Sequence, residues 1–348
     1  MLGVIDHLHR LVAANTTNPP RLISSDGGAV RYCAEVLEQC GFETRIIDLG
    51  DGCINLIAAR GAPRTIVNCH LDTVPVCEGW TCDPFSLRIE GSDAIGLGAC
   101  DIKGAAAAIL SAAQRTRGDA MIFFSTDEEA GSSQCVRTFL AEQPSDIDAA
   151  VVCEPTQCQA VTAHRGLLSV EAVFTGTSGH ASAASTDSAV HRAVKWSAAA
   201  LDWRERDHPA SRLSIGVIEG GVKPNMTASS ARVRFGLRPE VGASAESHLL
   251  ELKSLSGGAG VAWTERFHGP ALTPSHAAPA LAQRLGAPIG DPVDFWTEAA
   301  LFAAAGIPSV VFGPGSIAQA HAPNERVPVA QLELAATCYA RLFEGGLA

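Results

Sequence analysis

Several acidic and histidine residues stand where apolar, strand-like runs of the sequence end. They are His70, Asp72, Asp101, Glu128, Glu129, Glu154 and His321. A surface carboxylate needs no such placement, whereas carboxylates and imidazoles at the mouths of buried strands suit a hard or borderline divalent metal ion. A pair of metal ions needs about five such ligands. The sequence therefore predicts a metallohydrolase.

The first of these residues form an HxD pair. His70 and Asp72 are two residues apart at the end of the run TIVNCHLD, so both side chains leave a strand on the same face. A histidine that binds metal usually donates its other ring N–H to an acceptor that fixes the tautomer. We interpret Asp72 as that supporting group, provided that the chain bends after the strand.

Asp101 lies between the glycine-rich run GLGAC and a helix expected to begin near Lys103. Its carboxylate has two oxygens and could bridge two cations. The alternative is a helix N-cap, a position that aspartate favours. The presence of the other acidic motifs favours the bridging interpretation.

Glu128 and Glu129 directly follow the apolar run MIFFS and the residues TD. Adjacent carboxylates repel, so both remain ionised only beside solvent or a cation. One could bind metal while the other transfers protons. The alternative is an acidic surface turn. Glu154 ends the apolar run AAVVC, and His321 follows a strand and a glycine-rich loop, where a structural role is the alternative.

The chain has eleven cysteines and no CxxC pair, which predicts free thiols. Cys69, Cys100 and Cys153 each precede a candidate ligand, so thiolate ligation is conceivable. Neighbours on a strand point to opposite faces, however. If His70 faces a metal ion, Cys69 faces the core, where cysteine packs as a small apolar residue.

The pattern of elements predicts an α/β fold. Helical and strand-like segments alternate over the first 160 residues, which indicates a mostly parallel sheet whose sites lie beyond the carboxyl ends of its strands. From about Gly166 the order becomes β–α–β–β–α, which indicates an inserted two-layer α+β domain. We expect a discontinuous catalytic domain of residues 1–165 and 266–348, and an insertion of residues 166–265. A helix is expected at 295–306.

Composition restricts the possible partners. The net charge is −11 without any basic stripe, which argues against nucleic acid or an anionic membrane. No apolar run approaches the roughly 18 residues of a membrane span. The N-terminal segment has no basic region followed by a cleavage site, so no secretory signal is expected. We therefore expect a cytoplasmic protein.

In order along the chain, the motifs HLD, GACDIKG, DEEAGS, CEP and HAPNE resemble those of the M20 metallopeptidase group. This group includes acetylornithine deacetylase, succinyl-diaminopimelate desuccinylase and glutamate carboxypeptidases. The resemblance covers nearly the whole chain and implies two Zn²⁺ ions, with Co²⁺ as another option. It also implies a cis peptide bond at Asp101–Ile102. The resemblance implies that His70 and Glu154 bind one metal ion, that Glu129 and His321 bind the other, and that Asp101 bridges the two. It also implies that Asp72 supports His70 and that Glu128 is the general base.

The inserted segment resembles the lid or dimerisation domain of that group, which implies a homodimer. GTSGHAS aligns His180 with the family's oxyanion donor, although the following ASAASTDSAV lacks the usual proline and glycine. GGVKPNMT and FGLRP align Asn225 and Arg238 with positions that bind the substrate carboxylate. Arginine has a planar fork suited to that task. Without the resemblance, a surface salt bridge of Arg238 and a capped turn at His180 would be the alternatives.

The resemblance implies a small-molecule substrate, an N-acyl amino acid with a free carboxylate. The branch that deacetylates N-acetylornithine in arginine biosynthesis, including the variant that acts on N-acetylcitrulline, is the most similar. Glu298 could bind a polar substrate side chain, or could be an ordinary acid at a helix N-terminus. The alternatives are desuccinylation, dipeptide cleavage or a non-catalytic protein that binds metal or small molecules.

Overall fold

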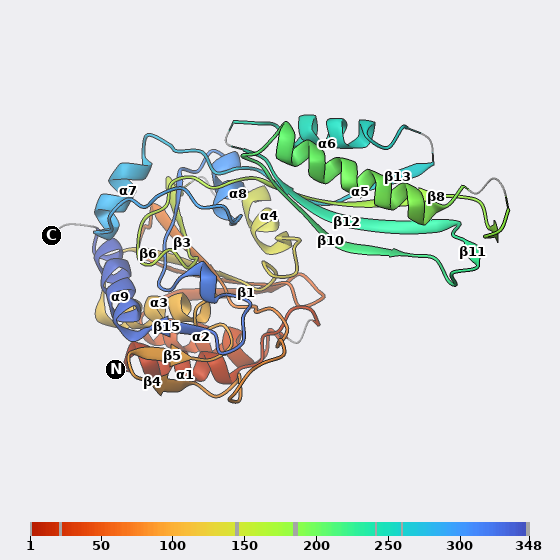
Figure 1. Ribbon diagram of the computed structural model, residues 1–348. Helices are drawn as coiled ribbons and strands as arrows, with labels where there is room; N and C mark the ends of the chain where they lie inside the picture. The colour runs from red at the N-terminus through yellow and green to blue at the C-terminus, as the bar shows by residue number, and fades with distance from the viewer. Residues whose placement is uncertain are drawn as a thin grey trace. The chain divides into compact units, whose positions relative to one another are not determined.

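The computed structural model describes residues 2–20, 23–142, 146–183, 187–240, 242–258 and 260–345. The chain forms two compact units (Figure 1). The larger unit comprises Met1–Ala163, Leu272–Val293 and Thr297–Ala348, and the smaller comprises His164–Ala271 and Asp294–Trp296. The expected end of the insertion at residue 265 is wrong, because it falls inside strand β13 (Val261–Gly269), which pairs along its length with β8 (Leu167–Thr175).

A six-stranded mixed sheet forms the centre of the larger unit. Its parallel part runs β6–β3–β7–β14, and two antiparallel neighbours extend it in the order β1–β2–β6. The predicted α/β architecture is therefore confirmed, and the carboxyl ends of β6, β3 and β7 lie side by side. The strands are β1 (Glu43–Asp48), β2 (Ile54–Arg60), β3 (Thr65–His70), β6 (Ala120–Ser125), β7 (Ala149–Val152) and β14 (Ser309–Val311).

Helices cover both faces of this sheet. Adjacent residues on β6 point to opposite sides: Phe124 joins the core under α3, while Phe123 stacks on Phe139 of α4 at a ring distance of 4.7 Å. The alanine-rich helix α3 is almost wholly buried among its neighbours. The helices are α1 (Val4–Ala13), α2 (Gly28–Gln39), α3 (Lys103–Arg115), α4 (Gln134–Ala141), α7 (Ala278–Leu285), α8 (Ala299–Ala304) and α9 (Val329–Phe343).

Shorter elements complete the larger unit. A three-stranded antiparallel sheet has the order β15–β5–β4, and a 3₁₀ turn at Ile317–Gln319 precedes His321. The three strands are β4 (Arg88–Glu90), β5 (Asp93–Ile95) and β15 (Arg326–Pro328). Within the described part of the chain, no helix combines the length and apolar character needed to cross a bilayer.

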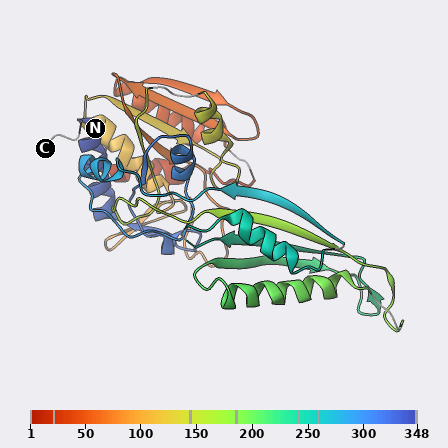
Figure 2. The ribbon, with the colours of Figure 1, turned by 90° about the horizontal axis from the view of Figure 1, so that it is seen from above.

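The smaller unit has two layers. Four antiparallel strands in the order β10–β12–β8–β13 form a sheet, and α5 (Ala189–Arg206) and α6 (Ala245–Ser254) lie on one face of it (Figures 1 and 2). Side chains along β12 (Ser230–Arg238) alternate between exposed and buried, as expected for a sheet covered on one face. Strand β10 is Arg212–Gly220, and a separate ribbon pairs β9 (Gly179–His180) with β11 (Met226–Thr227).

The helix expected at 295–306 is shorter than the sequence pattern suggested, since α8 begins only at Ala299. Asp294–Trp296 belongs to the smaller unit, where the Trp296 indole donates a hydrogen bond to the Pro270 carbonyl at 3.0 Å and packs on Phe267. Gly269 leaves room for this ring, because a Cβ there would lie 2.3 Å from its Nε1 atom.

Candidate metal centre

His70 is the last residue of β3, and its side chain is only 2% exposed. Its Nδ1 lies 3.0 Å from the backbone carbonyl of Asp72 and 3.5 Å from the Asp72 carboxylate. A carbonyl oxygen can only accept, so Nδ1 carries the proton and Nε2 presents a lone pair. The chain bends after β3, and Asp72 therefore orients the ring through a hydrogen bond to its backbone carbonyl, while its carboxylate lies nearby without such a bond.

Two groups of potential ligands share Asp101. His70 Nε2 lies 3.3 Å from Asp101 Oδ1 and 3.7 Å from Glu154 Oε1. On the other side of the same carboxylate, His321 Nε2 lies 3.4 Å from Asp101 Oδ2 and 3.0 Å from Glu129 Oε1. Ligands around a tetrahedral zinc ion with bonds near 2.0 Å are spaced by about 3.3 Å. These five residues are called the larger-unit centre below.

Two unpaired atoms of this centre, on His70 and Asp101, fit a cation between them. Among the described residues, the buried atoms His70 Nε2 and Asp101 Oδ1 have no hydrogen-bond partner. Burial raises the pKa of Glu154 well above its usual value, and repulsion from Asp101 adds to this while His70 opposes it. Carboxylates so crowded are costly without positive charge. Carboxylate oxygens and imidazole nitrogens together are the donors that borderline divalent metal ions prefer.

The loop before α3 holds Asp101 in place. The backbone N–H groups of Cys100 and Asp101 each donate to Glu325 Oε1 at 2.8 Å, and that of Gly98 donates to Oε2 at 3.0 Å. The peptide bond Asp101–Ile102 is cis, as the resemblance implied. The N-cap of α3 is Ile102, and no side chain caps it, so the alternative role of Asp101 as a helix cap is wrong. Glu325 ends the HAPNE motif, and its role was not predicted from the sequence.

Glu128 and Glu129 follow β6, whose end lies beside that of β3. The Glu129 backbone N–H donates to Asp72 Oδ2 at 2.9 Å, which joins the two motifs. Burial raises the pKa of Glu128 well above its usual value, His70 opposes this rise, and Glu129 adds to it. A bound divalent cation would lower that pKa again. Glu128 therefore lies where it can hold or release a proton beside the larger-unit centre.

Glu298 is the N-cap residue of α8 and is 1% exposed. Ser125 donates to its Oε2 at 3.4 Å, and burial raises its pKa to about 8. The position agrees with an acid at a helix N-terminus. A role in binding the substrate side chain stays a prediction.

Two of the three predicted residues of the smaller unit lie together. His180 is exposed on β9, with Nδ1 2.7 Å from the Ser182 hydroxyl, and Ala181 N–H donates to the Asn225 carbonyl at 3.1 Å. Arg238 lies at the far end of β12, half-buried, where burial lowers its pKa. Because the strand rises roughly 3.3 Å per residue, β12 alone separates Arg238 from this pair by about 26 Å.

All eleven cysteines are free, as predicted. Cys69, Cys100 and Cys153 are buried in the apolar core, and none of the described groups with metal-binding geometry contains a cysteine. Packing rather than ligation is therefore the role of these three side chains.

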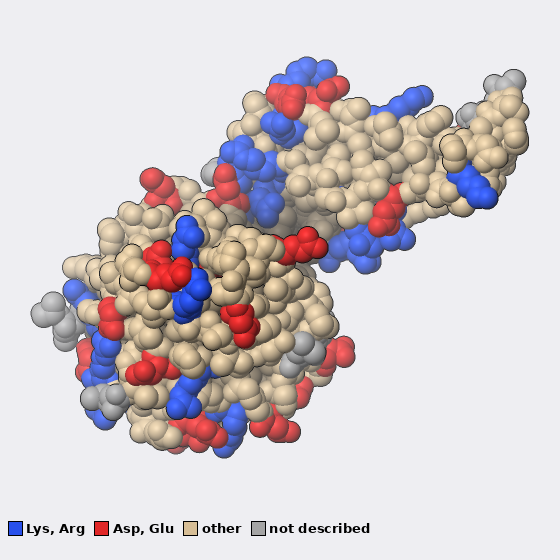
Figure 3. All heavy atoms as spheres, turned by 60° about the horizontal axis from the view of Figure 1, so that its bottom comes forward, with Lys and Arg blue, Asp and Glu red and all other residues tan. Residues whose placement is uncertain are grey.

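The described residues drawn on the face of the larger unit in Figure 3 show acidic and basic side chains interspersed, without a continuous basic stripe. The exclusion of nucleic acid made from the net charge of −11 stays a prediction.

Comparison with known proteins identifies the class. The model of peptidase family M20/M25/M40 matches residues 66–345, and the chain belongs to this family of hydrolases. It is 42% identical to N-acetyl-L-citrulline deacetylase of Xanthomonas campestris over 363 aligned positions, which cover 99% of this chain and 98% of that protein. It is also 29% identical to acetylornithine deacetylase of Proteus mirabilis, covering 92% of this chain and 90% of the relative.

Solved structures agree on the fold. An M20 family metallo-carboxypeptidase from Sulfolobus solfataricus superimposes with a TM-score of 0.79 at 16% identity, covering 99% of each chain. Aminopeptidase PepT from Bacillus cereus superimposes with a TM-score of 0.78 at 19% identity, covering 99% of this chain and 98% of that one.

Proposed function

We propose that this enzyme hydrolyses the N-acetyl group of an N²-acetyl-L-amino acid in arginine biosynthesis, with N-acetyl-L-citrulline as substrate and N-acetyl-L-ornithine as second candidate. The main support is the larger-unit centre, in which Asp101 faces two separate ligand groups. The 42% identity to an N-acetyl-L-citrulline deacetylase over 99% of the chain favours the first substrate. The 29% and 31% identities to acetylornithine deacetylases keep the second under consideration.

His70, Asp101 and Glu154 would hold one metal ion, and Asp101, Glu129 and His321 the other. Zn²⁺ suits this mixture of imidazole and carboxylate donors, and Co²⁺ accepts the same ligands. When bound, such ions polarise an acyl carbonyl and lower the pKa of the attacking water.

Glu128 is the proposed general base. It takes the proton of the attacking water and passes it to the departing amine, so that the amide C–N bond breaks with a neutral leaving group. Asp72 keeps His70 in the tautomer that binds metal. His180 donates a hydrogen bond to the oxygen that becomes negative during the attack.

We propose that the substrate carboxylate is bound by Asn225 and Arg238 of different chains in a homodimer. Within one chain Arg238 ends β12, whereas Asn225 precedes β11 and the start of β12. The strand alone spans about 26 Å, which no single carboxylate can bridge. His180 lies beside Asn225 and would enter the same composite site.

The smaller unit offers a surface for such pairing. Strand β10 is an edge of its sheet, so one side of its backbone has no strand neighbour within the described unit. Large apolar side chains are exposed on β10 and on α5: Ile218 is 51% exposed, Val194 53% and Leu201 41%. A second copy of the chain would cover them.

Rival activities remain within the same family. Desuccinylation or dipeptide cleavage would use the same centre with a different pocket for the acyl group. A non-catalytic binding protein is disfavoured, because Glu128 and all five proposed ligands are present. A cytoplasmic location is proposed because amino-acid biosynthesis takes place there.

The decisive experiment compares amine release from N-acetyl-L-citrulline and N-acetyl-L-ornithine. The enzyme is stripped with a chelator and reloaded with Zn²⁺ or Co²⁺. We expect metal-restored hydrolysis with a higher kcat/KM for the citrulline compound. Failure of the fully metallated enzyme on both substrates would refute the proposal, and succinylated amino acids and dipeptides would be assayed next.

The dimeric site has its own test. His180→Ala and Glu128→Gln chains are each assayed alone and then after unfolding and refolding together. If His180 acts across the interface, mixed dimers contain one intact site and roughly a quarter of all sites become active. No recovery, despite mixed dimers shown by native mass spectrometry, would place His180 in its own chain's site.

A further inference from the structure

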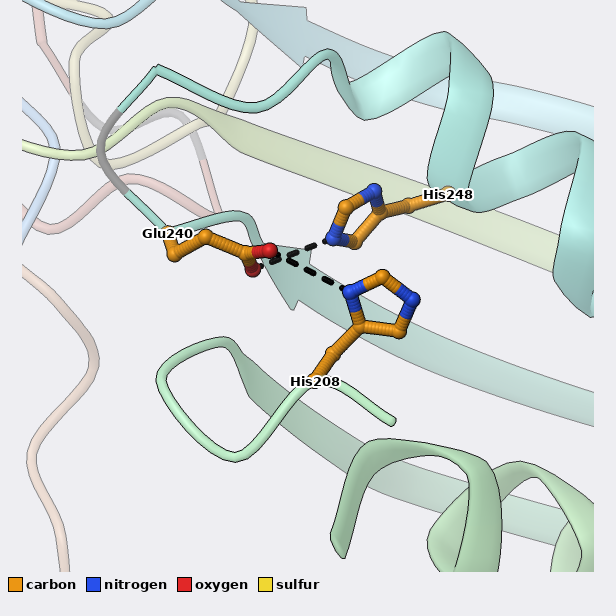
Figure 4. Close-up of side chains that lie close together, drawn as sticks. All are labelled: His208, Glu240 and His248. Atoms are coloured by element: carbon orange, nitrogen blue, oxygen red, sulfur yellow. Dashed lines mark hydrogen bonds and ion pairs between the residues drawn. The ribbon is translucent and has the colours of Figure 1, made fainter. Parts of the chain in front are cut away.

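A second cluster of metal-binding side chains lies in the smaller unit, made by His208, Glu240 and His248 (Figure 4). Each comes from a different segment: His208 from the turn after α5, Glu240 from the end of β12, and His248 from α6. We call these three residues the smaller-unit cluster. No motif or regular spacing in the sequence indicates it.

The Glu240 carboxylate lies between the two imidazole rings. Oε1 is 3.2 Å from His208 Nδ1, and Oε2 is 3.1 Å from His248 Nε2. One donor atom from each residue lies within 4.8 Å of the others, and the ring centroids are 4.2 Å apart. Ligands around tetrahedral zinc are about 3.3 Å apart, so a movement on the order of 1 Å would close the set around an ion.

An outer group of residues orients His208 as metal-binding histidines are usually oriented. Its Nε2 donates to the Glu251 carboxylate at 3.0 Å, which leaves Nδ1 facing Glu240. The Trp203 indole in turn donates to the same Glu251 oxygen at 2.8 Å. A carboxylate that accepts the N–H of a metal-binding histidine in this way fixes the tautomer of the imidazole ring and raises its basicity. The hydrogen bonds that orient His208 are therefore a second observation, separate from the short distances between the three donor atoms.

The walls of the cluster restrict both rings. The Trp203 ring lies 4.4 Å from His208 and 5.3 Å from His248, the latter edge to face. Ser211 donates to the Glu240 carboxylate and accepts the Glu240 N–H at 3.0 Å. The His208 and Glu240 side chains are 18% and 28% exposed, which gives an ion and a water ligand access from solvent.

We propose that the smaller-unit cluster is a third metal site, which binds one divalent transition-metal ion such as Zn²⁺ through two imidazoles and one carboxylate, with solvent as the fourth ligand. Two nitrogen donors and one oxygen donor suit a borderline ion and not Ca²⁺ or Mg²⁺. The ion would tie the α5–β10 turn, the end of β12 and α6 together. Its role is structural and does not depend on the proposed reaction.

The test counts metal ions per chain in the tag-free, full-length protein. Wild type and variants are stripped with a chelator, equilibrated with Zn²⁺ at a buffered free concentration and analysed by inductively coupled plasma mass spectrometry. We expect His208→Gln and Glu240→Gln to bind one Zn²⁺ per chain less than wild type. His191→Gln is the matched control, since it removes a histidine from α5 outside the cluster and should lose none.

A second variant covers the case in which the first two fail to fold. Glu251→Gln keeps all three ligands but weakens the acceptor that orients His208, so the affinity of this one site should fall by roughly 10- to 100-fold. Equal Zn²⁺ content and equal Zn²⁺ titration curves in wild type and all folded variants would overturn the proposal. The cluster would then be a network of hydrogen-bonded histidine and glutamate side chains only.

Discussion

The larger-unit centre and the smaller-unit cluster use the same residue types in opposite electrostatic balance. In the larger unit, Asp101, Glu129 and Glu154 face two imidazoles, and Glu128 and Asp72 add further negative charge nearby. In the smaller unit, Glu240 alone lies between two imidazoles. The first arrangement has an excess of carboxylates, and the second is close to neutral when one ring is protonated.

The pKa directions express this difference. Burial raises the pKa of Glu129 and of Glu154, and nearby carboxylates add to the effect. Without a bound ion, burial would also raise the pKa of Glu240, but hydrogen bonds from its own backbone N–H and from His208 and His248 lower it to about 2. The larger-unit centre therefore needs cations to be stable when ionised, whereas the smaller-unit cluster can persist without one.

The largest effect is expected from replacing Glu128, the proposed proton-transfer group of the larger unit. Glu128→Gln should lower kcat by a factor on the order of 10² or more, because the amide cannot accept the water proton. Metal content should stay at the wild-type value, since Glu128 is not among the ligands. The variant Glu35→Gln, on the exposed face of α2, serves as control. Wild-type turnover in Glu128→Gln would remove the proposed base.

Chelation should destabilise the two units differently as pH changes. The raised pKa values of Glu128, Glu129 and Glu154 mean that the metal-free larger unit loses stability as pH rises above 4.5, their usual value. Glu240, with its pKa lowered to about 2, gives its full contribution above 4.5 and loses it only as pH falls toward 2. Between pH 4.5 and 6.5, only the larger unit should therefore weaken.

This difference can be measured in the metal-free protein by thermal unfolding at pH 5.0 and 6.5. Tryptophan fluorescence follows mainly the smaller unit, which contains Trp196, Trp203, Trp263 and Trp296, while circular dichroism follows both units. Metal added at 1,000 times its Kd should restore about 4 kcal/mol per site. If the unfolding temperatures measured by fluorescence and by circular dichroism fall equally between pH 5.0 and 6.5, the proposed difference between the two units is contradicted.

Glu298 offers a smaller test within the larger unit. Its pKa is raised to about 8, so the wild-type enzyme loses stability from this group as pH rises from 4.5 to 8. Glu298→Gln removes that loss, on the order of 1.4 kcal/mol for each unit of pKa shift. Urea unfolding of the metal-loaded enzyme at pH 5 and 8.5 should show the variant gaining relative stability only at the higher pH. If the stability difference between variant and wild type is the same at both pH values, the raised pKa of Glu298 is contradicted. A raised KM of the variant for N-acetyl-L-citrulline would support a contact between Glu298 and the substrate side chain.

The smallest effect is expected at Cys69, one residue from a ligand but on the opposite face of β3. Cys69→Ser should keep its metal ions and lower the free energy of unfolding by about 1–3 kcal/mol, because a hydroxyl replaces a thiol in the apolar core. Equilibrium unfolding and metal analysis measure both quantities. Loss of a metal ion from the folded variant would show that Cys69 does more than pack in the core.

The larger-unit centre was predictable because parallel strands that lie side by side end at the same edge. His70 ends β3, Glu129 follows β6 and Glu154 follows β7, so their sequence positions alone indicate convergence. Glu325 was missed because it binds backbone N–H groups of a loop that is distant in the sequence. No pattern of side chains predicts such a contact.

The smaller-unit cluster was missed for a different reason. Its three members are spread over a turn, a strand end and a helix, with no shared spacing, and they meet only through antiparallel pairing and helix packing. Strand β13 was also missed, and the shortened α8 followed from the Trp296 contacts in the smaller unit. In these cases a tertiary contact, rather than a local pattern, decided the structure.

The way in which β8 and β13 pair also bears on how this chain could have changed over time. Leu167 lies opposite Gly269 in the sheet, so the inserted segment begins and ends at adjacent positions. Everything between them could be lengthened, trimmed or exchanged by genetic rearrangement without rethreading the six-stranded sheet, and only Asp294–Trp296 would lose its neighbours. Such a junction separates the history of the larger unit from that of the inserted segment.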